Sequence, residues 1–103
     1  MSIETKLSND KKIFSILIEG DFNFSLLHEF KASYNNDAAM AADKIIIDLR
    51  KTLTVDSSAL GMLLNLQKEL GKSGDDTSII NCNEMITKIL KITNFSKKFH
   101  IEE

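Results

Sequence analysis

The sequence predicts an α/β fold built on a mixed sheet, and three observations lead to this fold class. Residues 45–47 are three isoleucines in a row, which is typical of a buried strand. Apolar residues at helical spacing follow over residues 58–70, and a short apolar run follows at residues 77–81. A strand, a helix and a strand in this order form a right-handed βαβ unit, so the two strands are expected to be parallel.

The first part of the chain predicts an antiparallel β-hairpin. Apolar and polar residues alternate weakly over residues 1–7, and residues 12–19 predict a strand with Phe14, Ile16 and Ile18 on one face and Ile13, Leu17 and Glu19 on the other. The turn-forming cluster Ser8-Asn9-Asp10-Lys11 lies between the two runs. Gly20 is predicted to end the second strand.

A helix is predicted after the hairpin. Asn23 or Ser25 can cap its N-terminus, because each side chain carries an oxygen that accepts a backbone N–H. The apolar stripe of this helix consists of Leu26, Leu27, Phe30 and Tyr34. The alanine-rich segment 35–43 is either the end of the same helix or a second short one.

The central segment of the chain is expected to hold a buried strand, a loop and an amphipathic helix. We expect the strand at residues 45–47 to be covered on both faces, and the loop after it to be held by the inward side chains of Leu53 and Val55. Asp56 and Ser57 are the natural helix caps, since their oxygens can accept the free N–H groups of the first turn. The expected buried face of this helix is formed by Leu60, Leu63, Leu64, Gln67 and Leu70.

The last part of the chain predicts one more strand, one more helix and an edge strand. The strand covers residues 77–81, and Asn83 is placed to cap a helix over residues 84–93. Asn94 fits the left-handed position that commonly ends a helix, and residues 99–101 are expected to add the edge strand. The methionines at positions 40, 62 and 85 are expected to fill gaps in the core.

Composition limits the class of protein. The 103 residues predict a single domain over residues 1–103, and 43% hydrophobic content is ordinary for a globular chain. A formal net charge of −2 gives no electrostatic footprint for direct nucleic-acid binding. The single cysteine, Cys82, cannot form an internal disulfide, no signal peptide is visible, and the apolar runs are shorter than the roughly 20 residues of a membrane span. We therefore expect a cytoplasmic protein without membrane insertion.

No pattern of residues predicts a metal, a cofactor or a catalytic group. His28 and His100, together with the one cysteine, have no metal-ligand spacing. The segment Gly71-Lys72-Ser73 has the ending of a phosphate-binding loop, but Leu66 stands where the first glycine is needed. No Gly-x-Ser-x-Gly elbow surrounds the serine pair at positions 57 and 58, which argues against a serine hydrolase.

A family resemblance is carried by residues 45–64, IIIDLRKTLTVDSSALGMLL. This stretch resembles the signature of the STAS domains found in bacterial anti-sigma factor antagonists. The matching positions are Asp48-Leu49 at the strand end, the Asp56-Ser57-Ser58 helix start, the small residue Ala59, and Gly61. The resemblance implies the STAS fold along the whole chain: a mixed sheet of four to five strands, helices packed mainly on one side, and an N-terminal hairpin.

The resemblance also implies a function in transcription regulation by partner switching. In that family the second serine of the pair, here Ser58, is phosphorylated by a serine kinase that doubles as the anti-sigma factor. The unphosphorylated protein binds the kinase and frees the sigma factor, and a serine phosphatase resets the phosphoprotein. The chain would thus be a substrate and a binding module, not an enzyme. The partner-binding residues implied are Asp56, Ser57, Ser58, Ala59, Gly61, Met62 and Asn23. Asn23 stands where the family often has aspartate.

Several alternatives stay open at this point. From the residues alone, Ser57 and Ser58 are ordinary helix-start residues, and Asn23 is a helix cap. Asp56 either caps the helix or orients the Ser58 hydroxyl toward a kinase, and the two roles are compatible. The first rival function is a STAS accessory subunit of a larger complex, such as a lipid-trafficking ABC transporter. The second is a nucleotide-binding sensor domain.

Overall fold

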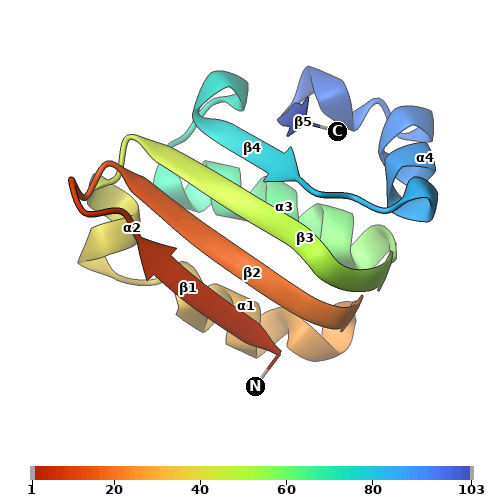
Figure 1. Ribbon diagram of the computed structural model, residues 1–103, viewed down its shortest axis with the longest axis horizontal. Helices are drawn as coiled ribbons and strands as arrows, with labels where there is room; N and C mark the ends of the chain where they lie inside the picture. Colours follow the sequence, from red (N-terminus) through yellow and green to blue (C-terminus); the bar gives the residue numbers. More distant parts are fainter. Residues whose placement is uncertain (1, 103) are drawn as a thin grey trace.

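The computed structural model describes residues 2–102 and contains a five-stranded sheet in the order β1-β2-β3-β4-β5 (Figure 1). The strands are β1 (Ile3–Leu7), β2 (Ile13–Phe22), β3 (Lys44–Val55), β4 (Thr77–Ile80) and β5 (His100–Glu102). The α-helices are α1 (Leu27–Tyr34), α2 (Asp37–Ala41), α3 (Ser57–Leu70) and α4 (Glu84–Ile92). Single 3-10 turns are η1 (Phe24–Leu26), η2 (Gly74–Asp76) and η3 (Phe95–Lys97). Only β1 and β2 pair antiparallel, so the predicted α/β class, hairpin, parallel crossover and edge strand are confirmed.

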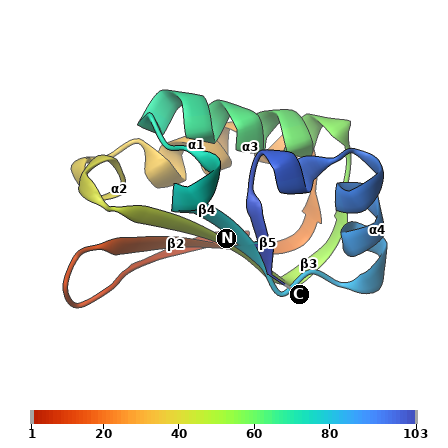
Figure 2. The same cartoon turned by 90° about the horizontal axis from the view of Figure 1, so that it is seen from above.

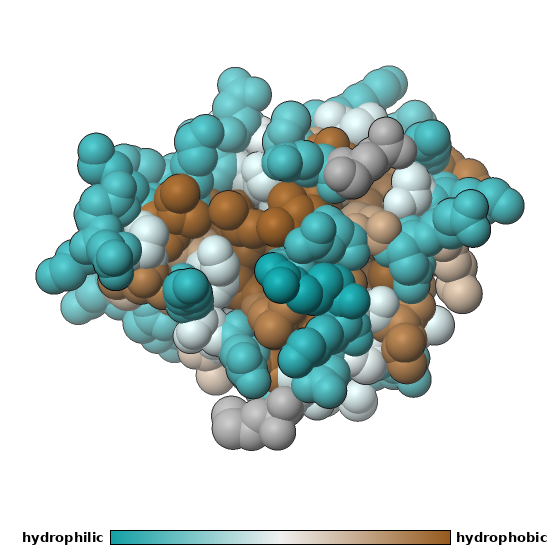
Figure 3. Space-filling view, in the orientation of Figure 1, coloured by the Kyte–Doolittle hydropathy of each residue, from teal (hydrophilic) through white to brown (hydrophobic). Residues whose placement is uncertain are grey.

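The helices α1 and α3 cover one face of the sheet and leave the other face open (Figure 2). The core lies between them, where alternate residues of the central strands are fully buried, among them Ile16, Ile47 and Ile79. On the open face, hydrophobic side chains gather in the middle of the surface (Figure 3), and Ile46 is only half-buried there. The expectation that strand 45–47 is covered on both faces is therefore wrong, because the helices pack on a single side of the sheet.

Strand β2 continues through Gly20 to Phe22, so the prediction that this glycine ends the strand is wrong. Gly20 has a φ of 87°, a conformation that favours glycine, and the pairing with β3 is irregular around it. Between the pairs Leu17–Asp48 and Glu19–Lys51, β2 advances by two residues and β3 by three. One extra residue on β3 is a β-bulge, and a second register shift follows between residues 20 and 21.

These bulges change which side chains of β3 face the core. Thr52 is 3% exposed and donates its hydroxyl to the carbonyl oxygen of Ile18 at 2.7 Å, whereas Leu53 is 63% exposed. Val55 is buried again at the end of the strand. The prediction of two inward side chains is thus confirmed for Val55 and wrong for Leu53, and the expected loop is the continuation of the strand.

Helix α3 buries a face slightly different from the expected one. Its buried residues are Ala59, Leu60, Met62, Leu63, Leu66 and Leu70. Leu64 is 39% exposed, so its expected place on the buried face is wrong. Gln67 is half-buried and its amide nitrogen lies 2.6 Å from the hydroxyl oxygen of the buried Thr77, so Gln67 does lie on the side of α3 that faces the sheet. A helix turns by about 100° per residue, and Leu64 therefore lies at the margin of a contact face that is centred on Leu63.

The predicted helix ends agree with the structure. The Asn83 side-chain oxygen accepts the backbone N–H of Ile86 at 2.8 Å and caps α4, and Asn94 has the expected left-handed backbone with a φ of 57°. The segment after α1 forms the second short helix α2. Met62 is buried as expected, but Met40 and Met85 are exposed, so these two do not fill gaps in the core.

Candidate functional site

The candidate site lies at one edge of the sheet, where the parallel strands end. Phe22, the last residue of β2, pairs with Val55, the last residue of β3. Helix α3 begins two residues later at Ser57, and α4 begins after the end of β4 on the same side of the molecule (Figure 1). In open α/β sheets, ligands and partners are usually met at this carboxyl edge.

The cap of α3 is the side chain of Asp56. Its carboxylate accepts the backbone N–H of Ala59 at 2.9 Å, and its main-chain carbonyl accepts the N–H of Leu60 at 3.2 Å. The capping role expected for Asp56 is confirmed. Ser57 is the first helical residue, and Ser58 follows in the first turn with its side chain half-buried. The helix is therefore capped by Asp56 alone, and the expectation that Ser57 is also a cap is wrong, because Ser57 is already part of the helix.

Only some of the residues expected to bind a partner at the start of α3 are exposed. Asp56, Ser57 and Gly61 are exposed, and Ser58 is half-buried beside them. Ala59 and Met62 are buried in the core. The expectation that these two side chains contact a partner directly is not supported, because they lie on the side of α3 that packs against the sheet.

The side chain of Asn23 forms hydrogen bonds within its own turn. Its side-chain oxygen accepts the backbone N–H of Ser25 at 2.9 Å and the Ser25 hydroxyl at 2.6 Å. This contact caps η1, as the interpretation of Asn23 as a helix cap predicts. Asn23 follows Phe22 directly, so this turn borders the same edge of the sheet as Ser58.

Three large apolar side chains at this edge are exposed. Phe24 is 66% exposed in η1, Leu53 is 63% exposed near the end of β3, and Met85 is 52% exposed in the first turn of α4. The side-chain amide of Asn83 donates to the carbonyl oxygen of Leu53 at 3.0 Å, which holds the start of α4 against β3. Sequence reasoning missed this group, since a bulge turned Leu53 outward and Met85 was assigned to the core.

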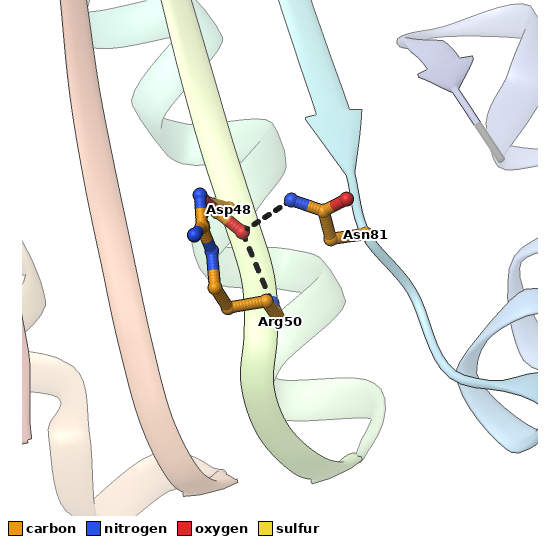
Figure 4. Close-up of polar contacts among 3 residues, drawn as sticks. All are labelled: Asp48, Arg50 and Asn81. Atoms are coloured by element: carbon orange, nitrogen blue, oxygen red, sulfur yellow. Dashed lines mark hydrogen bonds and ion pairs between the residues drawn. The ribbon is translucent and has the colours of Figure 1, made fainter.

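A buried carboxylate lies on β3 behind this edge (Figure 4). Asp48 is 8% exposed and accepts hydrogen bonds from the Arg50 backbone N–H at 3.0 Å, from Arg50 Nε at 2.9 Å and from Asn81 Nδ2 at 3.0 Å. Burial by itself raises the pKa of Asp48, but the hydrogen bonds from Arg50 and Asn81 outweigh it, so the pKa lies below its ordinary value. The sequence showed Asp48 only as a motif position and gave no sign of Asn81, which is 33 residues away.

The chemistry available at this edge is that of hydroxyl, amide and carboxylate groups. Within residues 2–102, no group of three or more His, Cys, Asp or Glu side chains is arranged to hold a metal ion. The one cysteine, Cys82, follows β4, and burial raises the pKa of its thiol to about 11. None of the helices described in residues 2–102 is both long and apolar enough to span a membrane.

Comparison with known proteins places the chain in a family. The STAS domain model matches residues 4–103, and the chain belongs to the STAS domain family. A STAS-domain containing protein of Pseudomonas aeruginosa (strain UCBPP-PA14) is 37% identical over 101 residues, which cover 98% of this chain and 99% of that protein.

Solved structures share the same fold. A protein of Thermotoga maritima, described as a candidate anti-sigma factor antagonist, superposes with a TM-score of 0.77 at 21% identity and covers 98% of this chain and 86% of its own. The Bacillus cell fate determinant SpoIIAA in its phosphorylated form has a TM-score of 0.67 at 16% identity, with 98% of this chain and 91% of that chain covered. At these identities the likeness concerns the fold, which is the mixed sheet with one helical layer predicted from the family resemblance.

Proposed function

We propose that the chain is an anti-sigma factor antagonist that is switched by phosphorylation of Ser58. The unphosphorylated form binds a serine-kinase anti-sigma factor in the cytoplasm, and the sigma factor is released. The kinase then transfers the γ-phosphoryl group of ATP to the Ser58 hydroxyl oxygen, ADP leaves, and the phosphorylated chain dissociates. A serine phosphatase hydrolyses the phosphate and restores binding.

The position of Ser58 carries this proposal. Its side chain is half-exposed in the first turn of α3, while the cap of that helix is supplied by Asp56. A hydroxyl that the fold does not need for capping is free to be modified. The family supports the same role, since the Thermotoga protein is described as a candidate anti-sigma factor antagonist and SpoIIAA has been solved in a phosphorylated form.

The fold is expected to tolerate a phosphate at Ser58. The first amides of a helix have no carbonyl partner within it, and the helix dipole favours negative charge at this end. A phosphate on Ser58 adds about 1.5 to 2 negative charges and several acceptor oxygens close to the amides of Ser57 and Ser58. The charge is therefore stabilised within the chain, and we expect it to destabilise the complex with the partner and not the fold.

A bound partner, in contrast, would have to bury the phosphate. Phe24, Leu53 and Met85 are exposed apolar groups at the same edge, and a partner that covers them excludes water from the neighbourhood of Ser58. If a partner carboxylate lies near the phosphate, two unit charges about 4 Å apart repel by roughly 4 kcal/mol at an effective dielectric constant of about 20. A hundredfold loss of affinity needs only about 2.7 kcal/mol. One phosphate is sufficient to release the partner.

In this role the chain is a substrate and a binding module. It supplies the Ser58 hydroxyl and the surface around it, and the kinase supplies the nucleotide and the catalytic groups. Asp56 takes part by fixing the start of α3 through its bond to Ala59, and with it the direction of the Ser58 side chain.

The test is a pull-down from host lysate with four baits: the wild-type chain, Ser58→Ala, Ser58→Asp and, as a matched control, Ser96→Asp. Ser96 is an exposed serine in η3, and an aspartate at this position adds the same charge away from the candidate site. We expect wild type, Ser58→Ala and Ser96→Asp to retain an ATPase of the anti-sigma kinase type and Ser58→Asp to lose it. Retention of the same partner by Ser58→Asp at wild-type strength would refute the switch.

The same experiment separates the rival functions. A transporter ATPase that co-purifies with all four baits would instead support the permanent accessory subunit. The nucleotide sensor is tested by titrating the isolated chain with GTP and ATP, for which we expect no saturable binding, since no glycine-rich phosphate loop follows a strand in the sequence.

A further inference from the structure

Strand β3 extends well beyond its pairing with β4. The last pair between the two strands is Asp48 with Ile80, whereas β3 continues to Val55. From Leu49 onward β3 is paired with β2 alone, and that pairing contains both register shifts. The part of β3 that leads into the candidate site therefore has one edge without a neighbouring strand.

Side-chain hydrogen bonds connect β3 to the segment after β4, beyond the point where the backbone pairing of the two strands stops. The Asp48 carboxylate accepts the Asn81 side-chain amide at 3.0 Å, across the gap that opens after Ile80 (Figure 4). Asn81 has a φ of 60°, a left-handed conformation that turns the chain toward α4. The bond to Asp48 thus holds the chain at the residue where its direction changes.

Two residues further on, the side chain of Asn83 makes a second contact with β3. Its side-chain amide donates to the carbonyl oxygens of Thr52 at 3.3 Å and Leu53 at 3.0 Å, and its side-chain oxygen caps α4 through Ile86. Asp48, Asn81, Asn83 and the end of β3 therefore form a closed ring of contacts. The ring joins the strand that leads to Ser58 with the helix that carries Met85.

We propose that Asp48 and Asn81 are positioning residues that hold the first turn of α4 and the end of β3 as one rigid partner-binding surface. The proposal rests on the proposed function, because it assigns the surface to the partner that Ser58 controls. Leu53 lies on one side of the ring and Met85 on the other. Without the bond from Asn81 to Asp48, only the bonds of Asn83 to β3 would hold the two apolar groups, so their separation would vary more and the partner would have to order them on binding.

The variant that tests this is Asn81→Gly. Truncation of Asp48 would also remove its bonds to Arg50, so it would not isolate the contact with Asn81. Glycine at position 81 removes the amide but favours the left-handed backbone already present, so the chain is expected to fold. Asn94→Gly is a matched control, since Asn94 has the same backbone conformation at the other end of α4, with a φ of 57°.

Two measurements are needed, and the first requires no partner. Amide hydrogen exchange of the isolated chain reports on the first turn of α4, where the N–H of Ile86 and the N–H of Thr87 are bonded to Asn83. We expect exchange at both amides to be at least fivefold faster in Asn81→Gly and unchanged in Asn94→Gly. Unchanged exchange in Asn81→Gly would show that Asp48 does not position this turn, whatever the function of the chain.

The second measurement is the affinity for the ATPase captured by the wild-type chain. We expect at least a tenfold loss for Asn81→Gly and wild-type affinity for Asn94→Gly, with the melting temperatures of both variants measured to confirm that they are folded. Faster exchange with unchanged affinity would overturn the claim that the ring positions the binding surface. If the wild-type chain captures no such ATPase, the proposed function fails, and the exchange measurement alone decides whether the ring is rigid.

Discussion

The carboxylate of Asp56 accepts the backbone N–H of Ala59 at 2.9 Å, so the helix that carries Ser58 is capped by aspartate. Two side chains in one short segment thus have separate tasks. Asp56 stabilises the helix start, and Ser58, which lies outside this contact, is the residue that we propose to be phosphorylated.

The separation of tasks predicts different costs for two alanine substitutions. Loss of an aspartate cap typically costs about 1 kcal/mol, so Asp56→Ala should lower the free energy of unfolding by about that amount. Ser58→Ala should change it by less than about 0.5 kcal/mol, as expected for a position outside the cap. Urea denaturation of the two variants and the wild type checks this. A larger loss for Ser58→Ala than for Asp56→Ala would make Ser58 a structural residue.

Gly61 is a glycine that the fold itself does not require. It lies inside α3, and a Cβ added there would meet no heavy atom within 4 Å. Glycine inside a helix costs about 0.5–1 kcal/mol relative to alanine, so Gly61→Ala should raise the free energy of unfolding by about this amount. Gly61 is exposed one turn from Ser58, and the added methyl group should weaken retention of the partner.

A matched control for this prediction is Asn65→Ala, one turn further along the exposed side of α3. Alanine is the better helix former at both positions, so both variants should be stabilised in urea denaturation. Only Gly61→Ala should lose partner in the pull-down. If both variants keep the partner equally, Gly61 does not lie in the contact.

The exposed apolar side chains give a third prediction. Leu53→Ser and Met85→Ser remove large apolar groups that are 63% and 52% exposed, so their effect on stability should be small. Partner affinity should fall at least tenfold for each, because a few large side chains that become buried at the centre of an interface carry most of its binding energy. Ile92→Ser is the control: Ile92 is 78% exposed but lies at the opposite end of α4. Equal losses for all three variants would point to general aggregation or unfolding and not to a defined surface.

The thiol of Cys82 gives a prediction on pH dependence. Burial raises its pKa from about 9 to about 11, so the reactive thiolate is scarce in the folded protein at neutral and mildly alkaline pH. Alkylation by iodoacetamide at pH 8 should therefore be much slower in the folded chain than in urea, and the folded rate should keep rising up to about pH 11. The labelling rate is measured by mass spectrometry. A folded rate that levels off near pH 9 would show an unperturbed thiol.

Local rules explain what the sequence predicted well. Asn83 and Asp56 cap helices through contacts that span three residues, and Asn94 adopts the left-handed backbone that its type favours. These contacts need no knowledge of the rest of the fold. The order of strands and helices also follows from local periodicity, and the family resemblance supplied their arrangement in space.

Long-range contacts explain what the sequence did not predict. Leu53 was expected inside because apolar and polar residues alternate up to Val55, but the bulges in the pairing of β3 with β2 changed the side that each residue faces. Asp48 meets Asn81 only because β3 and β4 are neighbours up to that pair, and no spacing in the sequence encodes it. Phe24 and Met85 are likewise far apart in the sequence, and only the assembled sheet places them at the same edge.

Phosphorylation by the captured partner tests the central claim most directly. The purified ATPase and the wild-type chain are incubated with ATP, the modified residue is mapped by mass spectrometry, and the affinity of the two proteins is measured before and after. We predict a single phosphate on Ser58 and at least a hundredfold weaker complex, which corresponds to about 2.7 kcal/mol. A phosphate on another residue, or equal affinity of the modified and unmodified chains, would contradict the proposal that Ser58 is the switch.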